Sequence, residues 1–107
     1  MSKPDWRDIH LDPPEGKDPV LVWHAYQGCL IMTPEDCLKN RFVTHWMNVP
    51  GGKWIRTSKR RPGKNDADIW GCVIARNAWY DQLEVTGWRQ FADDRKYSHW
   101  QRTPEPP

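Results

Sequence analysis

The chain has 107 residues, a net charge of +2, 37% hydrophobic residues and eight Trp. This is the length of one common domain, so halves of about fifty residues would be too small for large separate cores. No apolar run approaches the roughly 20 residues of a membrane-spanning helix, and Met1–Pro14 lacks the apolar stretch of a signal peptide. These features argue against a membrane partner and predict a soluble cytoplasmic protein.

The number of cysteines and the distribution of charge further limit the kinds of protein and site that the sequence allows. The chain has an odd number of cysteines, namely Cys29, Cys37 and Cys72. This predicts reduced thiols rather than a disulfide framework. No C-x-x-C or H-x-x-x-H spacing is present, so we expect no metal site, and we expect no cofactor. Residues 1–50 hold five Lys or Arg against seven Asp or Glu, and residues 51–107 hold eleven against seven. The second half is therefore the basic one.

The first half predicts a hairpin, a short helix and a third strand. β-Branched and aromatic residues over 20–26 and apolar residues over 29–32 flank a turn at Gln27-Gly28. The uninterrupted apolar character of these two strands predicts that they are covered on both faces. The segment 33–40 begins with Thr, Pro and two acids, which is typical of a short helix. The third strand is predicted over 41–46.

The second half repeats this pattern after a Pro- and Gly-containing link. Residues 71–77 and 82–88 form the equivalent hairpin, and in its second strand apolar and polar residues alternate. That alternation predicts a half-exposed strand. Residues 89–94 lack the helix signals of the first half, and 95–100 form the last strand. The tail 103–107 is expected to be extended.

The two halves align as diverged copies. The matches, in chain order, are Trp6 with Trp54, Val20–Val22 with Val73–Ala75, Leu30–Thr33 with Leu83–Thr86, and Arg41–Trp46 with Arg95–Trp100. The offset grows from 48 to 53 to 54, which places insertions between elements. Such an ordered series indicates an internal duplication. We expect residues 1–50 and 54–107, joined by 51–53, to form two similar three-stranded antiparallel units. They would pack about an approximate twofold axis into one mainly β composite domain with at most short helices, the Trp46 and Trp100 strands near its centre.

The closing segments of both copies carry a family resemblance. Val43–Pro50 and Tyr97–Pro107 resemble the T-H-W-M-x-x-P-x-P-P ending of the phage and prophage family called domain of unknown function 551. The family's opening Trp, Pro-containing loop and V-L-V strand are similar to Trp6–Val22 and to Trp54–Ile74. Gln101 stands where the family has Met, and the first copy lacks the Pro-rich end. The resemblance implies a small viral accessory protein, a class that often blocks host proteins, including defence systems. It implies no catalytic residue.

His45 and His99 are the best candidates for a chemical site, because each stands between a hydroxyl residue and a Trp. Neighbours on a strand point to opposite faces, so Thr44 and His45 are not expected to form a nucleophile and base pair. The favoured interpretation is that both rings are structural, bonded to backbone or carboxylate. A role on a binding surface is the alternative, and catalysis or metal binding is the least favoured. We therefore predict no catalytic residue.

The tryptophans fall into two sets. Those that recur in both copies are predicted to be core, since a small domain needs their buried area, and they are Trp6, Trp46, Trp54 and Trp100. The others are predicted surface anchors, because Trp is enriched in interface hot spots, and they are Trp23, Trp70, Trp79 and Trp88. Among this second set only Trp79 has an aromatic counterpart, Tyr26.

The segment 53–64 contains six cations in twelve residues. Its candidates for phosphate contact are Arg56, Lys59, Arg60, Arg61 and Lys64. Trp54 in the same segment could stack on a base. The alternative is a solvated loop, because the whole chain has a net charge of only +2 and two Asp follow at once.

Three functions follow from these observations. The first is a non-enzymatic, phage-type accessory protein that binds and blocks a host protein. The second is a nucleic-acid-binding protein that uses the basic segment 53–64. The third sequesters a nucleotide-like signal between the copies, with Trp stacking and with Arg76, Arg89 or Arg95 holding phosphate. The sequence leaves the oligomeric state open.

Overall fold

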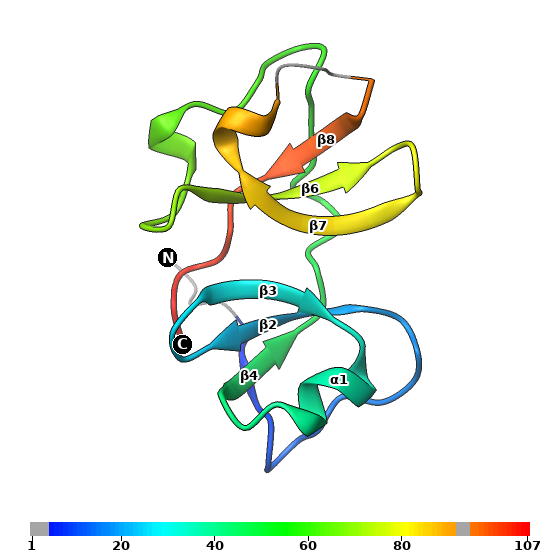
Figure 1. The fold of residues 1–107 in the computed structure, drawn as a ribbon, viewed down its shortest axis with the longest axis vertical. Coiled ribbons are helices and arrows are strands. Elements are labelled where there is room, and N and C mark those ends of the chain that lie inside the picture. The colour runs from blue at the N-terminus through cyan, green and yellow to red at the C-terminus, as the bar shows by residue number, and fades with distance from the viewer. Residues whose placement is uncertain (1–4, 92–94) are drawn as a thin grey trace. The chain divides into compact units, whose positions relative to one another are not determined.

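The computed structural model describes residues 5–91 and 95–107, which form two compact units. Unit 1 comprises Met1–Val49 together with the tail Pro104–Pro107, and unit 2 comprises Pro50–Thr103. Each unit is built on a four-stranded antiparallel sheet, so the predicted mainly β fold is confirmed (Figure 1). The tail joins unit 1 through Trp6, whose Nε1 donates a 2.7 Å hydrogen bond to the Glu105 carbonyl oxygen.

Unit 1 has four strands and one short helix. They are β1 (Arg7–Asp8), β2 (Val20–His24), β3 (Gly28–Met32), α1 (Pro34–Lys39) and β4 (Val43–Met47). The strand order in the sheet is β1-β4-β2-β3. The strand β4, which carries Trp46, is therefore internal, and β1 and β3 are the edges.

The helix α1 begins as its sequence predicts. The Thr33 side chain accepts a 3.2 Å hydrogen bond from Asp36 N, and Pro34 occupies the first turn. Lys39 Nζ lies 3.0 Å from Glu35 Oε1 in an i,i+4 pair. Cys37 is buried against the sheet, so one face of the helix closes the core of unit 1.

Unit 2 repeats the arrangement, and its described residues, 50–91 and 95–103, contain no α-helix. Its elements are β5 (Ile55–Arg56), η1 (Lys64–Asp66), β6 (Cys72–Asn77), β7 (Gln82–Gly87), η2 (Trp88–Gln90) and β8 (Tyr97–Gln101), where η denotes a 3-10 turn. The strand order β5-β8-β6-β7 is the same as in unit 1. The segment that corresponds to α1 starts with η2, and residues 92–94 of the predicted non-helical stretch lie outside the described residues.

The register of the two sheets also agrees. Trp46 pairs with Arg7 on one side and Val22 on the other, and Trp100 pairs with Ile55 and Ala75. Both sheets have a bulge at the same place, where the inner strand pairing shifts by one residue. The prediction that the two copies fold alike is confirmed.

Two details of the predicted units are wrong. Each sheet has four strands rather than three, because β1 and β5 are two-residue edge strands too short to show a period in the sequence. The match of Leu30 with Leu83 is wrong by one position. In the sheets Leu30 pairs with Val22, and it is Glu84 that pairs with Ala75. The reason is that the turn after β6 has one residue more than the turn after β2.

Each unit has its own apolar cluster. In unit 1 its buried members are Ile9, Val20, Val22, Cys37, Val43 and Trp46, and in unit 2 they are Val73, Ala75, Phe91, Tyr97 and Trp100. Three successive residues of β2, Val20 to Val22, are at most 5% exposed, so this strand is covered on both faces as predicted. The same prediction is wrong for β3, where Leu30 to Met32 are half-buried because this strand lies at the edge of the sheet. The strand β7 is half-buried, which also agrees with its alternating sequence.

The remaining sequence-based expectations concern the thiols and the membrane. Among the described residues none of the three cysteines forms a disulfide, and two of them, Cys29 and Cys37, are buried. Burial raises the pKa of the Cys37 thiol. Within residues 5–91 and 95–107 there is no helix with the length and apolar character needed to cross a membrane.

Candidate functional site

The turns that follow β2 and β6 are shaped by the last residue of each strand. In unit 1 the turn is Ala25–Gln27, and in unit 2 it is Ala78–Asp81. Asn77 Oδ1 accepts hydrogen bonds from Trp79 N at 3.0 Å and Tyr80 N at 3.3 Å. His24 Nδ1 accepts the corresponding two bonds in unit 1. A side-chain acceptor of this kind satisfies turn amides that no ladder partner reaches.

In unit 2 this turn presents two large aromatic side chains to solvent. Trp79 is 58% exposed and Tyr80 is 68% exposed. The Lys96 ammonium lies 5.8 Å from the centre of the Trp79 ring and 5.1 Å from that of Tyr97. Arg76 forms a 2.7 Å ion pair with Asp81 at the base of the turn. We refer to Arg76, Trp79, Tyr80, Asp81 and Lys96 as the unit 2 tip.

The unit 2 tip stands on a partly buried polar network. Asn77, 1% exposed, donates from Nδ2 to Glu84 Oε1 at 3.1 Å. The hydroxyl of Tyr97 donates to the other oxygen of Glu84 at 3.0 Å. Asn77 is therefore bonded both to the turn amides and to the neighbouring strand. Because Asn77 already fixes the turn, Trp79 and Tyr80 would lose less conformational entropy on binding a partner.

The topology of unit 2 brings part of the basic segment to this same end of the sheet. Neighbouring strands are antiparallel, so the end of β5 lies beside the start of β8, and the end of β6 lies beside the starts of β8 and β7. The ends of β5 and β6 are therefore at the same end of the sheet. Arg56 ends β5, and Lys59 follows in a turn closed by a 3.0 Å bond from Lys59 N to Arg56 O. Both side chains are exposed, and Arg95, also exposed, directly precedes Lys96. Cations thus accompany the exposed aromatic residues.

Unit 1 has a corresponding tip with different chemistry. Tyr26 takes the place of Trp79, is 72% exposed and packs edge-on against Phe42 with the ring centres 5.3 Å apart. The guanidinium of Arg41 lies 4.9 Å from the centre of the Phe42 ring. The sequence predicts Tyr26 as part of a strand, but the strand ends at His24 because the side chain of His24 closes the turn. We refer to His24, Tyr26, Arg41 and Phe42 as the unit 1 tip.

The other tryptophans are distributed differently from the prediction. Trp46 and Trp100 are buried at 6% and 0% exposure, as predicted. Trp6 and Trp54, which are predicted to be core, are only half-buried. They precede two-residue edge strands and pack against Trp23 and His99 respectively, with ring centres 6.1 Å and 6.5 Å apart, so they do not belong to the apolar clusters.

Of the four predicted surface anchors, Trp79 and Trp70 are exposed, and Trp23 and Trp88 are half-buried. Trp70, 42% exposed, precedes β6 and so lies at the opposite end of that strand from Trp79. The ring of Trp88 is covered by Arg89, whose guanidinium lies 5.1 Å from the ring centre. Trp79 is therefore the anchor that the structure presents most openly.

The basic segment is partly occupied by contacts within unit 2. Arg60 Nη1 donates to Asp66 Oδ2 at 2.9 Å, and Arg102 Nη2 donates to Asp66 Oδ1 at 2.7 Å. Hydrogen bonds from Arg60, from Gly63 N and from Arg102 hold the pKa of Asp66 well below its usual range. Arg60 also lies over the Trp100 ring at 4.8 Å. The structure thus gives Arg60 a structural role rather than a free guanidinium.

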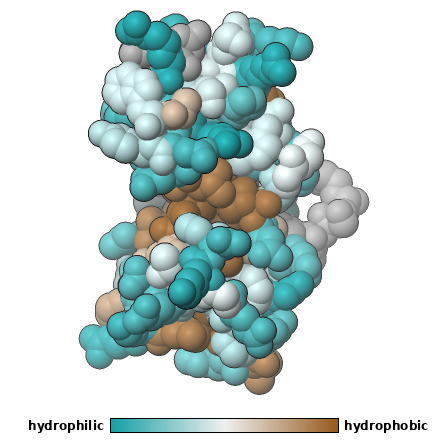
Figure 2. Space-filling model, turned by 90° about the vertical axis from the view of Figure 1, so that its right-hand side faces the viewer, coloured by the Kyte–Doolittle hydropathy of each residue, from teal (hydrophilic) through white to brown (hydrophobic). Residues whose placement is uncertain are grey.

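The other cations of the basic segment point to solvent. Arg56, Lys59, Arg61 and Lys64 are all exposed. Unit 2 holds eleven Lys or Arg against six Asp or Glu, which gives a net charge of +5, and unit 1 with its tail holds five against eight, a net charge of −3. In the view of Figure 2 the surface of unit 2 is coloured mainly teal and white, which marks hydrophilic to intermediate residues.

The two predicted histidines make the contact that strand alternation argues against. His45 Nδ1 lies 2.9 Å from Thr44 Oγ1, and His99 Nδ1 lies 2.9 Å from Ser98 Oγ. The bulge is the reason, since it leaves Thr44 and Ser98 without a partner on the inner strand and disturbs the alternation. His45 faces Asp8 across the ladder, whereas His99 faces Arg56. The paired residue across this ladder is thus a carboxylate for His45 and a cation for His99.

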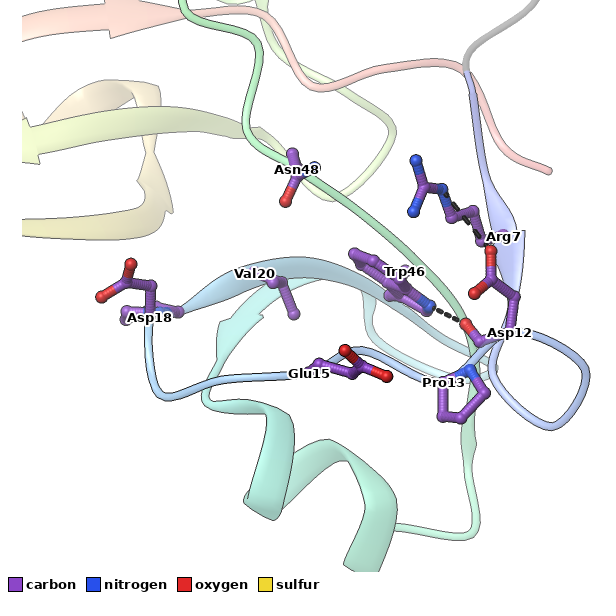
Figure 3. A pocket seen from close by; sticks show the side chains of 9 residues that line it. Arg7, Asp12, Pro13, Glu15, Asp18, Val20, Trp46 and Asn48 are labelled. Carbon is purple, nitrogen blue, oxygen red and sulfur yellow. Dashed lines mark hydrogen bonds and ion pairs between the residues drawn. The ribbon is translucent and has the colours of Figure 1, made fainter.

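Unit 1 also has a cavity of about 400 Å³ beside Trp46 (Figure 3). It is lined by Arg7, Asp12, Pro13, Glu15, Asp18, Pro19, Val20, Trp46 and Asn48. The guanidinium of Arg7 lies 5.0 Å from the centre of the Trp46 ring, and its Nε is 3.8 Å from Asp12 Oδ2. The aromatic wall of this cavity is therefore already covered by a cation of the same chain.

Among the residues that the structure describes, no three His, Cys, Asp or Glu side chains are grouped so that they could hold a metal ion. Comparison of the chain with protein-family models, with curated proteins and with solved structures found no match. The candidate functional site therefore depends on the geometry of the tips.

Proposed function

We propose that this protein is a non-enzymatic binding protein that attaches to a partner protein through the unit 2 tip. The observation that carries the proposal is the exposure of Trp79 and Tyr80, at 58% and 68%, on a turn fixed by buried Asn77. The resemblance of the chain to a phage and prophage family supports a protein of the bacterial host as the partner. Binding would then block a surface of that host protein.

The composition of the unit 2 tip fits a protein interface. Hot spots in such interfaces are enriched in Trp, Tyr and Arg and are surrounded by polar residues. Trp79 and Tyr80 supply the aromatic area, and Arg76 and Lys96 supply hydrogen-bond donors. Arg76 is paired with Asp81, and Lys96 lies against aromatic ring faces. Each of these contacts is exposed enough to be exchanged for a contact with a partner.

Site-specific photocrosslinking tests this function. A photoreactive phenylalanine analogue replaces Tyr80 in one variant and Leu38, which is 55% exposed on α1 of unit 1, in a matched control. We expect the Tyr80 variant to form one major crosslinked protein band in nuclease-treated bacterial lysate, and the band to be lost when Trp79→Ala is added. The proposal is wrong if positions 80 and 38 crosslink to the same proteins with similar yield.

Nucleic-acid binding is the second candidate, and one observation favours it. Arg56 and Lys59 share an end of the sheet with Trp79, which combines phosphate-binding cations with a stacking surface. Fluorescence anisotropy with a labelled single-stranded oligonucleotide tests it. Affinity should fall steeply with salt, and Arg56→Glu with Lys59→Glu should abolish binding. Binding that is unaffected by salt or by these charge reversals would exclude this function.

A further inference from the structure

The two tips use different side chains for the same hydrogen bonds. In unit 2 the acceptor is the amide oxygen of Asn77, which does not titrate. In unit 1 it is Nδ1 of His24, which accepts from Tyr26 N at 3.1 Å and from Gln27 N at 3.2 Å. His24 is only 6% exposed. The duplication therefore provides one turn whose amides are held by a titratable acceptor and one whose amides are held by an acceptor that does not titrate.

The two backbone donors determine the state of the His24 ring. A nitrogen that accepts from an N–H must carry a free lone pair, so Nδ1 is unprotonated and the proton of the neutral ring is on Nε2. An imidazolium is a donor at both nitrogens, and its Nδ1 proton would point at the two amide protons. Protonation of His24 thus removes both bonds at once. It also leaves two turn amides without an acceptor next to a buried charge.

The surroundings of His24 offer little compensation for a positive charge. Across the ladders it pairs with Gly28 of β3 and Val43 of β4, neither of which is charged. The rings of Phe42 and Tyr26 lie 5.6 Å and 6.3 Å from its own. The Phe42 ring is in turn covered by the guanidinium of Arg41, 4.9 Å from its centre, and this group is itself a cation. Among the described residues, no carboxylate forms a hydrogen bond or ion pair with His24.

We infer that the unit 1 tip is a pH-sensitive switch in which protonation of His24 releases the turn that holds Tyr26, while the unit 2 tip is unaffected. Release frees Tyr26 from its contact with Phe42 and makes the unit 1 tip mobile. Any effect on partner binding rests on the proposed function, but the opening of the turn does not.

Nuclear magnetic resonance of the intact chain tests the switch. Amide hydrogen exchange, corrected for intrinsic rates, is compared at about pH 7.5 and about pH 5. We expect the protection of the Tyr26 and Gln27 amides to fall by about tenfold or more at the lower pH, while Trp79 and Tyr80 change little. The ¹⁵N shifts of His24 should change over the same range from the Nε2-protonated neutral ring to imidazolium.

Two exchange variants make the experiment decisive. His24→Asn places the unit 2 acceptor in unit 1 and should remove the pH response of Tyr26 and Gln27. Asn77→His should introduce a response at Trp79 and Tyr80, and it serves as the test if the first variant does not fold. The inference is overturned if the wild-type unit 1 amides stay protected when His24 is an imidazolium, or if His24→Asn leaves their response unchanged. The readout involves no partner, so failure of the crosslinking experiment would not alter it.

Discussion

The indole Nε1 of Trp100 donates a 2.7 Å hydrogen bond to the carbonyl oxygen of Arg60, forty residues earlier in the chain. In unit 1 the indole of Trp46 donates to the carbonyl oxygen of Asp12 in the same way. Each indole connects the last strand of its sheet to the loop that follows the first strand. Both rings are buried, so in each unit one side chain fills the core and fixes a loop.

Trp100→Phe should destabilise unit 2 strongly. The variant leaves a cavity in a fully buried site and deprives the Arg60 carbonyl of its donor, which together cost about 2–4 kcal/mol. Urea unfolding followed by circular dichroism measures the loss. Trp79→Phe makes the same chemical change at a site that is 58% exposed and should cost less than about 0.5 kcal/mol. Equal losses in the two variants would contradict these assignments of Trp100 and Trp79.

Thr33→Ala should weaken the start of α1. The Thr33 hydroxyl accepts a hydrogen bond from Asp36 N at this helix end, and its loss costs about 0.5–2 kcal/mol. Thr33→Ser retains an acceptor at the same position and should recover most of the stability. Thermal unfolding of the three proteins checks the order. If the Ser variant were as unstable as the Ala variant, the cap would not be the cause.

Local signals in the sequence predicted the helix and strands, but the sequence did not predict the contacts between residues far apart in the chain. The Thr-Pro start of α1 and the apolar strand Val20–Val22 act over a few residues, so they could be read directly. The repeat predicted that both halves share one topology. The one-residue error in matching Leu30 arose because a single extra residue in a turn leaves no mark on the apolar pattern of the next strand.

The site was predicted only in part. Trp79 was identified as a surface anchor because it lacks a Trp in the other copy, but Tyr80 was not identified, since an exposed Tyr has no sequence signature. The basic run suggested that the Arg60 guanidinium is free. In the structure Arg60 and Arg102 both donate to Asp66, and Arg102 follows Asp66 by 36 residues. The acceptor role of His24 depends on where β2 ends, and the strand was predicted to run two residues further.

Thr57→Val should stabilise unit 2. Thr57 is 2% exposed, and its Oγ1 has no hydrogen-bond partner among the described residues. In unit 1 the equivalent position, which also donates its N–H to the last strand, is the apolar Ile9. Replacing the hydroxyl with a methyl group of similar size should raise the free energy of unfolding by about 1 kcal/mol.

Thr103→Val is the matched control for this change. The Thr103 hydroxyl donates to Asp68 Oδ2 at 3.2 Å, so the same substitution there removes a bond and should lower stability by about 0.5–1.5 kcal/mol. Urea unfolding of both variants gives the two signs. Destabilisation by Thr57→Val would show that its hydroxyl has a partner in solution.

Asp66→Asn should make unit 2 less stable at neutral pH and less sensitive to acid. The carboxylate is 7% exposed and accepts from Arg60, Arg102 and Gly63 N. Loss of its charge weakens these bonds and costs about 1–3 kcal/mol near pH 7. The two guanidinium groups are more than half exposed, so water can solvate them in the variant.

The pH dependence follows from the lowered pKa of Asp66, for which the hydrogen bond from Arg60 is the largest cause. Because the unfolded chain takes up the proton at about pH 4 and the folded chain resists it, the contribution of Asp66 is complete above this pH. It is lost as the pH falls further, toward the folded-state pKa. The free energy of unfolding of the wild type should therefore decrease between about pH 5 and pH 2 more steeply than that of Asp66→Asn.

Asp81→Asn separates this effect from a general loss of negative charge. Asp81 pairs with Arg76 at 2.7 Å, but its side chain is 80% exposed, so solvent screens the pair. Asn also tolerates the positive φ of 50° at this position, so the turn should not be strained. Chemical denaturation at several pH values should therefore show a wild-type acid response for Asp81→Asn. If Asp66→Asn and the wild type lost stability in parallel below about pH 5, the cluster of Arg60, Asp66 and Arg102 would contribute nothing to folding.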